Sequence, residues 1–455
     1  MHIAFFCLPE HGGYAPTFQL TKQLIARGHW VTYFGPIDFE ERVRNQGFDY
    51  VTLYADELVK GMMDPDAVTE EGAFGALRQI RGHLRRISLH ERWEVLQGVA
   101  DNEFAGILRA HGVDLVLVDG LFSFMVPLVA ASGIPYQVYL TELSGARGEN
   151  ATPSYSGGIP GRAGALGALK IKLSWVRALP QIVRLFWLNA LYIGIPRPPK
   201  TLLKMVKLRV RESARRAGLK RSLWEYGWRW ADGEVVLCPA AFDFPETRCG
   251  RTYAGPCIDL ERKDWPFPWE EFEQRRGSRK LVLVSLGTRS SEYGNTPARF
   301  LRKVFEVATR CPQLFFVMAL GKGRTIESVG TPPENVMAFP FLPQLDLLER
   351  ANAMITNGGL GTVKECIWFK VPLIVAPCRF DQPSNAARIV RHDLGRRVNV
   401  GRVSVAHLQE AVQTCLDDPL IAENIAAMSA AFRGSDEQER WIEGLLSQGT
   451  VTTSA

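Results

Sequence analysis

Short apolar runs alternate with helix-like segments in two separate series, and this alternation restricts the fold more than any other feature. The first series begins with IAFFCL at 3–8, a helical stretch near 17–27 and VTYF at 31–34. The second begins with LVLVSLG at 281–287 and continues with LFFVMAL at 314–320. Apolar strands separated by single helices are typical of parallel sheets. The sequence therefore predicts an α/β protein with two Rossmann-like, doubly wound parallel-sheet domains and a ligand cleft between them.

The stretch between the two series is rich in prolines and aromatic residues without periodicity, and we interpret it as an interdomain connection. We expect a first domain over residues 1–250, with an insert near 155–230, and a connecting segment over 251–279. A second domain is expected over 280–436, followed by a helix and a tail over 437–455. With 455 residues and 46% hydrophobic composition, the chain is long and apolar enough to bury two cores.

A glycine-rich turn, Asn357 to Thr362, follows the apolar run 353–356 and opens a predicted helix. Gly359 and Gly361 let a ligand approach the backbone closely, and the unpaired N–H groups of a first helical turn bind anions. Such a turn also occurs as an ordinary connection between a strand and a helix, so its surroundings decide its meaning. Glu365, one helical turn further on, faces the same way and is able to accept both hydroxyls of a ribose.

Asp381 and Gln382 follow the next predicted strand, 371–377, at the end of the sheet where open α/β folds bind ligands. Together with FLPQ at 341–344, the NGGLGT turn and Glu365, they resemble the donor-binding signature of the family 1 glycosyltransferases. These nucleotide-sugar-dependent enzymes have two Rossmann-like domains, the GT-B fold, and include bacterial macrolide and carotenoid glycosyltransferases. The resemblance covers about fifty residues in consistent order and spacing.

The resemblance implies a role for each of these residues by its position. Phe341 and Gln344 would hold the base, and Glu365 would hold the ribose. The diphosphate would lie on Gly359, Gly361 and Thr362, and the sugar hydroxyls would be bound by Asp381 and Gln382. Ser285 and Thr288, at the end of LVLVSLGT, match a second phosphate-contacting turn of the family. Asn357 stands where the family usually has a histidine, so one phosphate contact would become a neutral amide. The resemblance also implies that the last helix crosses back to the first domain.

Glycosyl transfer also needs the proton of the acceptor hydroxyl to be removed, and a positioned base contributes about 10²–10⁴-fold. The family supplies a histidine from the loop after the first strand, and an aspartate at a later strand end orients its ring. Here the loop reads PEHGGYAP, and anchoring it on Pro16 places Gly13 at the position of that histidine, whereas Asp119 matches the aspartate. Three explanations stay open: His11 swings into the site, Asp119 takes the proton directly, or the acceptor needs little help from a base.

The eight cysteines form no CxxC pair and no Cys/His spacing typical of metal sites, which predicts buried, reduced thiols in a cytoplasmic protein. The N-terminal residues lack the basic region of a signal peptide and fit a first strand instead. No cluster of metal ligands is evident in the sequence. The resemblance implies inversion at the transferred sugar without an essential metal, so we expect no cofactor, with a UDP-sugar as co-substrate.

A basic and apolar segment, 166–221, lies inside the predicted insert. Between Arg162 and Arg221 the chain has fifteen Lys or Arg residues and one acid, Glu212. Its longest charge-free run, 185–196, is twelve residues long and too short to span a bilayer. Two interpretations stay open: a peripheral element that contacts anionic lipid, or a wall of the acceptor pocket whose charges face water. Both predict a hydrophobic acceptor, and neither favours nucleic acid.

The sequence as a whole predicts a glycosyltransferase that moves a hexose onto a hydroxyl of a lipophilic small molecule, such as a polyketide, terpenoid, carotenoid or lipid. Glu365 favours a UDP-sugar, and Gln382 favours glucose. Two alternatives stay open. Gly13 and Asn357 also fit a regulatory relative that binds nucleotide without catalysis, and the same architecture serves nucleotide-sugar epimerases and hydrolases.

Overall fold

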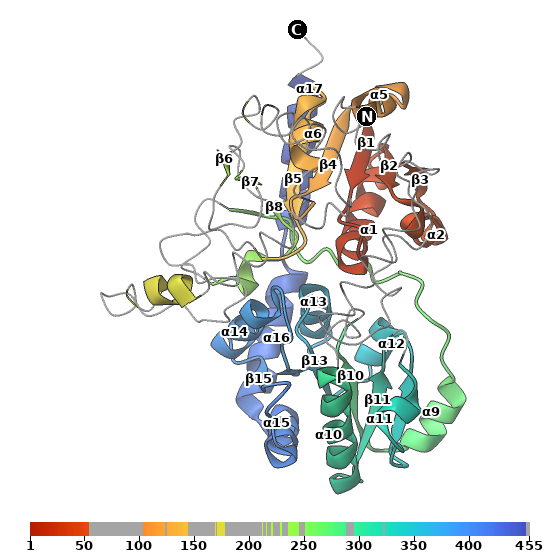
Figure 1. Cartoon of the computed structure of the whole chain (residues 1–455), viewed down its shortest axis with the longest axis vertical. Coiled ribbons are helices and arrows are strands. Elements are labelled where there is room, and N and C mark those ends of the chain that lie inside the picture. The colour runs from red at the N-terminus through yellow and green to blue at the C-terminus, as the bar shows by residue number, and fades with distance from the viewer. Residues whose placement is uncertain are drawn as a thin grey trace, which may run out of the picture.

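The computed structural model describes residues 1–53, 103–122, 125–143, 169, 171–177, 212, 215, 220–221, 228–229, 235–244, 251–287, 295–321 and 324–451. Within these ranges the chain forms two parallel-sheet α/β domains that lie one above the other in Figure 1. The predicted fold class is confirmed. Thr288 and most of the predicted insert lie outside the described residues, and the predicted domain boundaries stay predictions.

The first domain contains a sheet in which all strand pairs are parallel. In spatial order its described strands are β3 (Asp49–Thr52), β2 (Trp30–Gly35), β1 (His2–Phe6), β4 (Leu115–Asp119), β5 (Tyr136–Leu140), β8 (Val235–Val236) and β9 (Thr252–Tyr253). Every residue of β1 and β4 is buried, as expected for central strands that are covered on both faces.

The helices of the first domain fill the connections between these strands. They are α1 (His11–Ala26), η1 (Ile37–Phe39), α2 (Glu40–Asn45), α5 (Glu103–Ala110), α6 (Met125–Ala131) and η3 (Ala240–Phe242). α1 begins at His11, whereas the sequence predicted a start near residue 17. Glu10 is extended, with φ −144° and ψ 156°, and Gly13 N already donates to Glu10 O at 3.0 Å. The loop after β1 is therefore shorter than its glycines suggested.

The second domain contains a parallel sheet with the spatial order β12 (Val336–Phe339), β11 (Leu314–Ala319), β10 (Lys280–Ser285), β13 (Ala353–Thr356), β14 (Leu373–Val375) and β15 (Gly395–Arg397). Its helices are α9 (Trp269–Arg276), α10 (Thr296–Arg310), α11 (Ile326–Val329), α12 (Gln344–Leu348), α13 (Leu360–Trp368), α14 (Gln382–Arg391), α15 (Val405–Asp417) and α16 (Pro419–Arg433). A separate antiparallel pair, β6 (Lys220–Arg221) and β7 (Trp228–Arg229), lies within the predicted insert.

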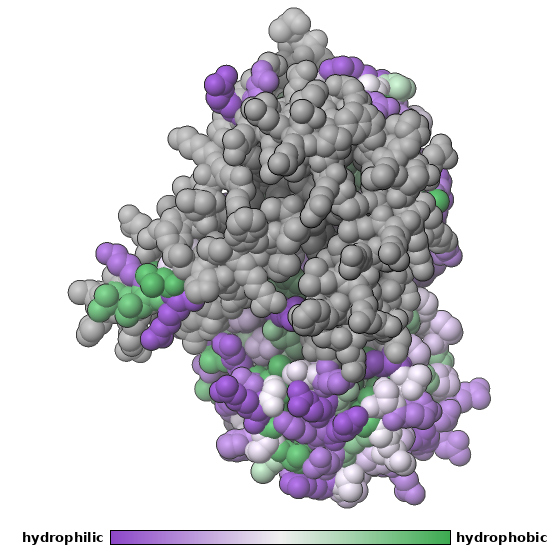
Figure 2. Space-filling view, in the orientation of Figure 1, coloured by the Kyte–Doolittle hydropathy of each residue, from purple (hydrophilic) through white to green (hydrophobic). Residues whose placement is uncertain are grey.

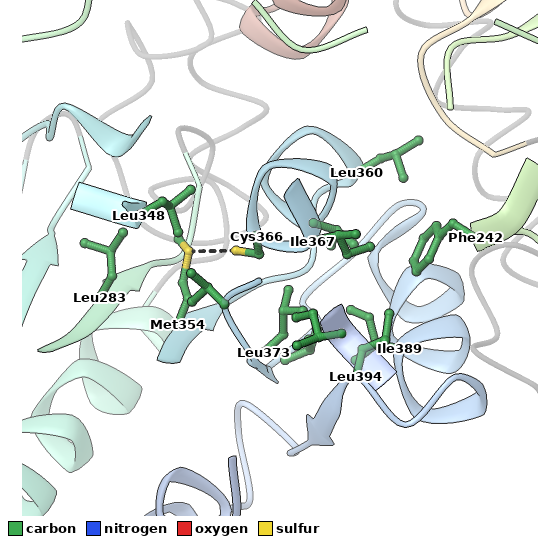
Figure 3. Packing of buried hydrophobic residues seen from close by; sticks show 14 of the residues in the cluster. Phe242, Leu283, Leu348, Met354, Leu360, Cys366, Ile367, Leu373, Ile389 and Leu394 are labelled. Atoms are coloured by element: carbon green, nitrogen blue, oxygen red, sulfur yellow. Dashed lines mark hydrogen bonds between the residues drawn. The ribbon is translucent and has the colours of Figure 1, made fainter. Parts of the chain in front are cut away.

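One apolar cluster spans the two domains. Phe242 of the first domain belongs to the same cluster as Leu360 and Ile367 of α13 and Leu373 of β14, and Figure 3 shows these side chains around α13. In the same cluster, Cys366 Sγ lies 3.3 Å from Met354 Sδ. The base of the glycine-rich turn is therefore fixed by packing that both domains share.

The last helix, α17 (Glu437–Val451), returns to the first domain. Its residues Trp441, Ile442 and Leu445 pack into the apolar cluster formed by β1, α1 and β2, and Figure 1 shows α17 beside the first sheet. At Gly255 the chain adopts φ +69°, and a Cβ there would lie 3.2 Å from Gln438. The two ends of the chain thus stabilise a single domain.

Within the described ranges, none of the helices has the length and apolar character needed to cross a bilayer. The described cysteines are all unpaired thiols, and Cys378 alone among them is partly exposed. These cysteines agree with the prediction of reduced thiols; Cys249 lies outside the described residues.

Candidate active site

The second sheet reverses its strand order between β10 and β13, so the loops after these two strands lie at a topological switch point, where open α/β sheets bind ligands. Ser285 is the last residue of β10, and Asn357 directly follows β13. The two loops touch: Gly287 has φ +79°, and a Cβ on it would come within 2.7 Å of Asn357 Nδ2. The structure thus brings Ser285 and Asn357 to one edge of the sheet, as predicted.

The glycine-rich turn leaves open space at two of its glycines. Position 358 requires a glycine, because its φ is +83° and a Cβ there would lie 2.6 Å from Val375 Cγ1. A Cβ on Gly361 would meet no protein atom within 4 Å, and one on Gly359 would meet only Asn357 Oδ1, at 3.8 Å. Protein packing therefore does not require glycine at 359 or 361. The N-terminus of α13 can be approached there by an anionic ligand.

Asn385 holds this turn in place, a role that the sequence did not single out. Its side chain is fully buried on α14, and Nδ2 donates to Gly358 O at 2.9 Å and to Asp381 Oδ2 at 2.8 Å. The spacing of four residues between Asp381 and Asn385 places both on one face of a helix, which was the available signal.

Three residues predicted for different parts of the nucleotide meet where α12 lies against α13. Gln344 Nε2 lies 2.5 Å from Glu365 Oε2 and 3.3 Å from Thr362 Oγ1. Glu365 is 6% exposed. A carboxylate with a neighbouring amide and hydroxyl provides acceptors and donors for ribose and phosphate oxygens.

The carboxylate of Glu365 is also bound by an arginine from the connecting segment. Arg262 Nη1 forms an ion pair with Glu365 Oε1, and Arg262 Nε donates to Asp264 Oδ1 at 3.0 Å. Burial lowers the pKa of Arg262, but the charges of Glu365 and Asp264 outweigh it and raise that pKa above its ordinary value. The same segment reaches Phe341, whose ring stacks on Trp265 with centroids 4.6 Å apart and an interplanar angle of 18°.

Asp381 and Gln382 lie at the N-terminus of α14, close to the glycine-rich turn. Burial raises the pKa of Asp381 to about 6, against the hydrogen bond from Asn385 and the charge of Arg388. Gln382 is 5% exposed, and its Oε1 accepts from Cys378 N at 2.9 Å and Arg379 N at 3.0 Å. The amide oxygen of Gln382 therefore holds the preceding loop.

On the first domain, Asp119 ends β4 and is fully buried. Its Oδ1 accepts from Leu121 N at 2.9 Å, and its Oδ2 lies 3.4 Å from both Leu8 N and Thr141 Oγ1. Burial raises the pKa of Asp119 to about 7, although the hydrogen bonds from Leu121 and Leu8 act in the opposite direction. A carboxyl with this pKa can exchange a proton near neutral pH.

His11, the first residue of α1, forms no hydrogen bond or ion pair with Asp119. Its Nε2 accepts a hydrogen bond from Arg42 Nη2 on α2. Burial, followed by the charges of Arg42 and Arg262, holds the pKa of His11 well below its ordinary value. Because the guanidinium is always a donor, the lone pair of Nε2 is engaged and Nδ1 carries the proton of the neutral ring.

Gly13 has no room for a side chain. A Cβ at this position would lie 2.3 Å from Leu8 O and 3.2 Å from Leu8 Cβ. The carbonyl of Leu8 is turned inward because Glu10 N donates to it at 2.7 Å. The position that the family resemblance assigns to the catalytic histidine is therefore closed by the backbone of the preceding turn.

Glu10 lies in the same turn and was not among the predicted site residues. Its side chain does not cap α1. Its charge contributes to the raised pKa of both Asp119 and Asp381, which belong to different domains. The turn after β1 thus faces the start of α14 across the interdomain boundary.

A buried polar network joins the domains next to this site. Asp243 Oδ1 lies 2.6 Å from Arg388 Nη2 on α14, and Asp243 Oδ2 lies 3.1 Å from Arg251 Nη1 and 2.7 Å from Tyr253 Oη. Burial tends to raise the pKa of Asp243, but the two arginines bring it below its ordinary value. On α13, the buried Lys364 donates to Leu237 O of the first domain at 2.7 Å.

Comparison with known proteins agrees with this architecture. The family model described as UDP-glucuronosyl and UDP-glucosyl transferase matches residues 231–437. The chain is similar to an oleandomycin glycosyltransferase from Streptomyces antibioticus, with 26% identity over 94% of this chain and 86% of that protein. It is also similar to a demethyllactenocin mycarosyltransferase from Streptomyces fradiae, with 27% identity over 98% and 87%.

Solved structures show the same fold over the whole chain. The kitacinnamycin glycosyltransferase aligns with a TM-score of 0.61 and 22% identity, covering 98% of each chain. The calicheamicin glycosyltransferase CalG4 aligns with a TM-score of 0.60 and 19% identity, covering 100% of this chain and 99% of that one. The glycine-rich turn at the switch point of the second sheet, the family-model match over residues 231–437 and the named relatives together support a sugar transferase of family 1 with the GT-B fold.

Proposed function

We propose that this protein transfers a hexose, glucose from UDP-glucose, with inversion, to a hydroxyl of a lipophilic small molecule. The observation that carries the donor half is the meeting of Gln344, Thr362 and Glu365 beside the open glycine-rich turn. In this proposal the base lies on Phe341, and Glu365 accepts the ribose hydroxyls. The diphosphate binds at the N-terminus of α13, where Asn357 begins the glycine-rich turn and the loop after β10 supplies Ser285 and Thr288.

The chemistry follows from what each end of the donor needs. The N–H groups of α13 and the glycine-rich turn are fixed dipoles, and they stabilise the negative charge that develops on the leaving diphosphate. Asp381 and Gln382 orient the sugar hydroxyls. The acceptor oxygen attacks the anomeric carbon from the opposite side, its proton passes to a base on the first domain, and the bond to the diphosphate breaks.

Of the two catalytic candidates, the geometry favours Asp119 over His11. The Nε2 lone pair of His11 is engaged by Arg42, whereas the pKa of Asp119 lies near 7. Asp119 is buried, but the partly exposed Thr141 places its hydroxyl 3.4 Å from Asp119 Oδ2. We therefore propose that Thr141 passes the proton of the acceptor to Asp119, donating its own proton as it accepts that of the substrate.

The acceptor class is proposed from the relatives and from one exposed helical face. Both full-length relatives named above carry natural products in their names, oleandomycin and demethyllactenocin. In the segment 171–177, Ile171 and Trp175 are buried, whereas Leu173 is 46% and Val176 is 62% exposed. Figure 2 shows apolar and polar surface side by side on this projecting segment, which is yellow in Figure 1.

That exposed face also supports the proposed peripheral membrane contact of segment 166–221 by a cytoplasmic protein. Lys172 and Arg177 are exposed beside the apolar residues, an arrangement that suits an anionic lipid surface. Co-sedimentation with vesicles that contain anionic lipid is expected for the wild-type protein and lost in a Leu173→Asp/Val176→Asp variant. Equal sedimentation of both proteins would assign this face to another role.

The function is tested by incubating the protein with UDP-glucose, with and without a panel of hydrophobic alcohols, and measuring UDP release. Release that depends on the acceptor supports transfer, release without acceptor indicates a hydrolase, and binding without turnover indicates a regulatory relative. TDP-glucose serves as the competing donor, since a related fold, the spinosyn rhamnosyltransferase SpnG, is described in complex with thymidine diphosphate. A preference for TDP-glucose would contradict the assignment of UDP.

For the donor site, Glu365→Gln is expected to weaken UDP binding by about 10–100-fold, because charge-assisted hydrogen bonds to the ribose are lost. Binding of 2′-deoxy-UDP, which lacks one of these hydroxyls, should weaken less. Calorimetric titration measures both affinities. Glu349→Gln, an exposed carboxylate after α12, is the matched control and should leave both unchanged. An equal loss for the two nucleotides would remove Glu365 from ribose recognition.

A further inference from the structure

The segment that connects the two domains touches the donor site at two separate residues. Arg262 binds the carboxylate proposed to hold the ribose, and Trp265 stacks on the ring proposed to hold the base. Both contacts imitate a nucleoside chemically, because a guanidinium donates hydrogen bonds to a carboxylate as ribose hydroxyls do, and an indole stacks on an aromatic ring as a base does.

These contacts leave little room for a nucleotide in the same orientation. Glu365 has one oxygen paired with Arg262 and the other 2.5 Å from Gln344 Nε2. The Trp265 and Phe341 rings are 4.6 Å apart, which is contact distance for stacked rings and too short for a base to lie between them. A donor that uses Glu365 and the covered face of Phe341 must therefore displace Arg262 and Trp265.

The start of the segment is anchored more firmly than residues 262–265 that follow it. Lys22 on α1 binds Asp259 at 2.7 Å and Glu261 at 3.1 Å, which anchors the start of the segment to the first domain. Trp265, in contrast, is 52% exposed although it is a large aromatic residue. Outside the donor site, residues 262–265 are held by two long hydrogen bonds, from Arg262 N to Asp259 O and from Lys263 N to Gln46 Oε1, each at 3.4 Å.

We propose that Arg262 and Trp265 occupy the donor site in the nucleotide-free protein and that residues 262–265 leave it when the nucleotide binds. This inference rests on the proposed donor site. Displacing the segment costs free energy, and the apparent affinity for the donor is reduced by the fraction of molecules in which the site is closed. The connecting segment then acts as an autoinhibitory segment that competes reversibly with the nucleotide for the donor site.

If the segment competes with the nucleotide, substitutions in it should strengthen nucleotide binding, whereas substitution of a binding residue weakens it. Arg262→Gln and Trp265→Ala should each tighten binding of UDP, by about tenfold for Arg262→Gln, since the closed fraction falls. The same factor is expected for 2′-deoxy-UDP, because the displacement cost does not depend on the ligand. Lys263→Ala is the control, since this exposed side chain lies between the two and only its backbone N–H contacts Gln46. Titration calorimetry measures all four proteins.

A second measurement needs no variant. Hydrogen exchange of the peptide that covers 262–265 should become faster when UDP is added to the wild-type protein, because the segment leaves its contacts. Slower exchange would overturn the proposal, since the segment would then close over the nucleotide. Weaker or unchanged UDP binding in both Arg262→Gln and Trp265→Ala would overturn it as well. If no variant and no wild-type protein binds any nucleotide, the proposed function itself fails.

Discussion

Asparagine in place of Asp119 is expected to lower kcat by about 10²–10⁴-fold, because the amide cannot take the proton of the acceptor. The affinity for UDP should stay unchanged, since Asp119 lies on the first domain and the donor residues lie on the second. Steady-state kinetics and a UDP titration check the two halves of this expectation. A variant with wild-type kcat would remove Asp119 from proton transfer.

The pH profile gives the same residue a second test. Burial raises the pKa of Asp119 to about 7, and only the ionised carboxylate acts as a base. The rate of the wild-type protein should therefore rise as pH increases through about 7 and level off above it. The Asp119→Asn variant should lose this rise. A rise that persists in the variant would assign it to another group.

Three further variants test which residues transfer the proton of the acceptor. Thr141→Val removes the hydroxyl next to Asp119 and should lower kcat, whereas Thr141→Ser retains it and should preserve most of the activity. His11→Ala should change kcat by less than about tenfold, because its Nε2 is already engaged by Arg42. A loss in His11→Ala as large as in Asp119→Asn would return the role of base to His11.

Replacing Asp243 with alanine is expected to lower the free energy of unfolding by about 3–5 kcal/mol, the range for a buried ion pair that loses one partner. The substitution leaves Arg388 and Arg251 buried without their carboxylate, at the junction of the two domains. Glu271→Gln, which breaks an exposed ion pair with Arg275, should cost less than about 0.5 kcal/mol. Urea denaturation of the three proteins measures the difference.

The contribution of Asp243 depends on pH in a defined direction. The pKa of Asp243 is lowered in the folded protein, so its stabilising effect is fully present well above the ordinary carboxyl pKa of about 3.9. The effect is lost as pH falls below that value towards the folded pKa. The gap in unfolding free energy between wild type and Asp243→Ala should therefore shrink at acidic pH. A constant gap would mean that packing, and not charge, accounts for it.

The sequence predicted the fold well where its pattern was periodic. β10, β11 and β13 were all expected from continuous apolar runs, and they form the central part of the second sheet. β15 (Gly395–Arg397) was missed because GRR has no strand pattern. It forms only because Leu373 pairs with Gly395, at which a Cβ would lie 1.9 Å from Leu373 O. Its partner strand, and not its own residues, makes it a strand.

Site features that depend on residues close together in the sequence could be predicted. Those that depend on contacts between distant segments could not. Helical spacing placed Thr362 and Glu365 on one side of a helix, whereas Gln344 was linked to the same ligand only through the family resemblance. The ion pair of Arg262 with Glu365 joins residues 103 positions apart, and no periodicity in the sequence indicates it. The engagement of His11 by Arg42 likewise depends on how α1 and α2 pack.

The turn that closes over Gly13 also limits how this enzyme could change. Where a catalytic side chain has been lost by substitution alone, one codon can restore it. Here Leu8 O occupies the place of the Cβ, so Gly13→His would force the whole turn from Leu8 to Glu10 to refold before the new ring could reach an acceptor. A substitution at residue 13 alone therefore cannot create a histidine-based catalyst, because the turn from Leu8 to Glu10 must first be lengthened or reversed.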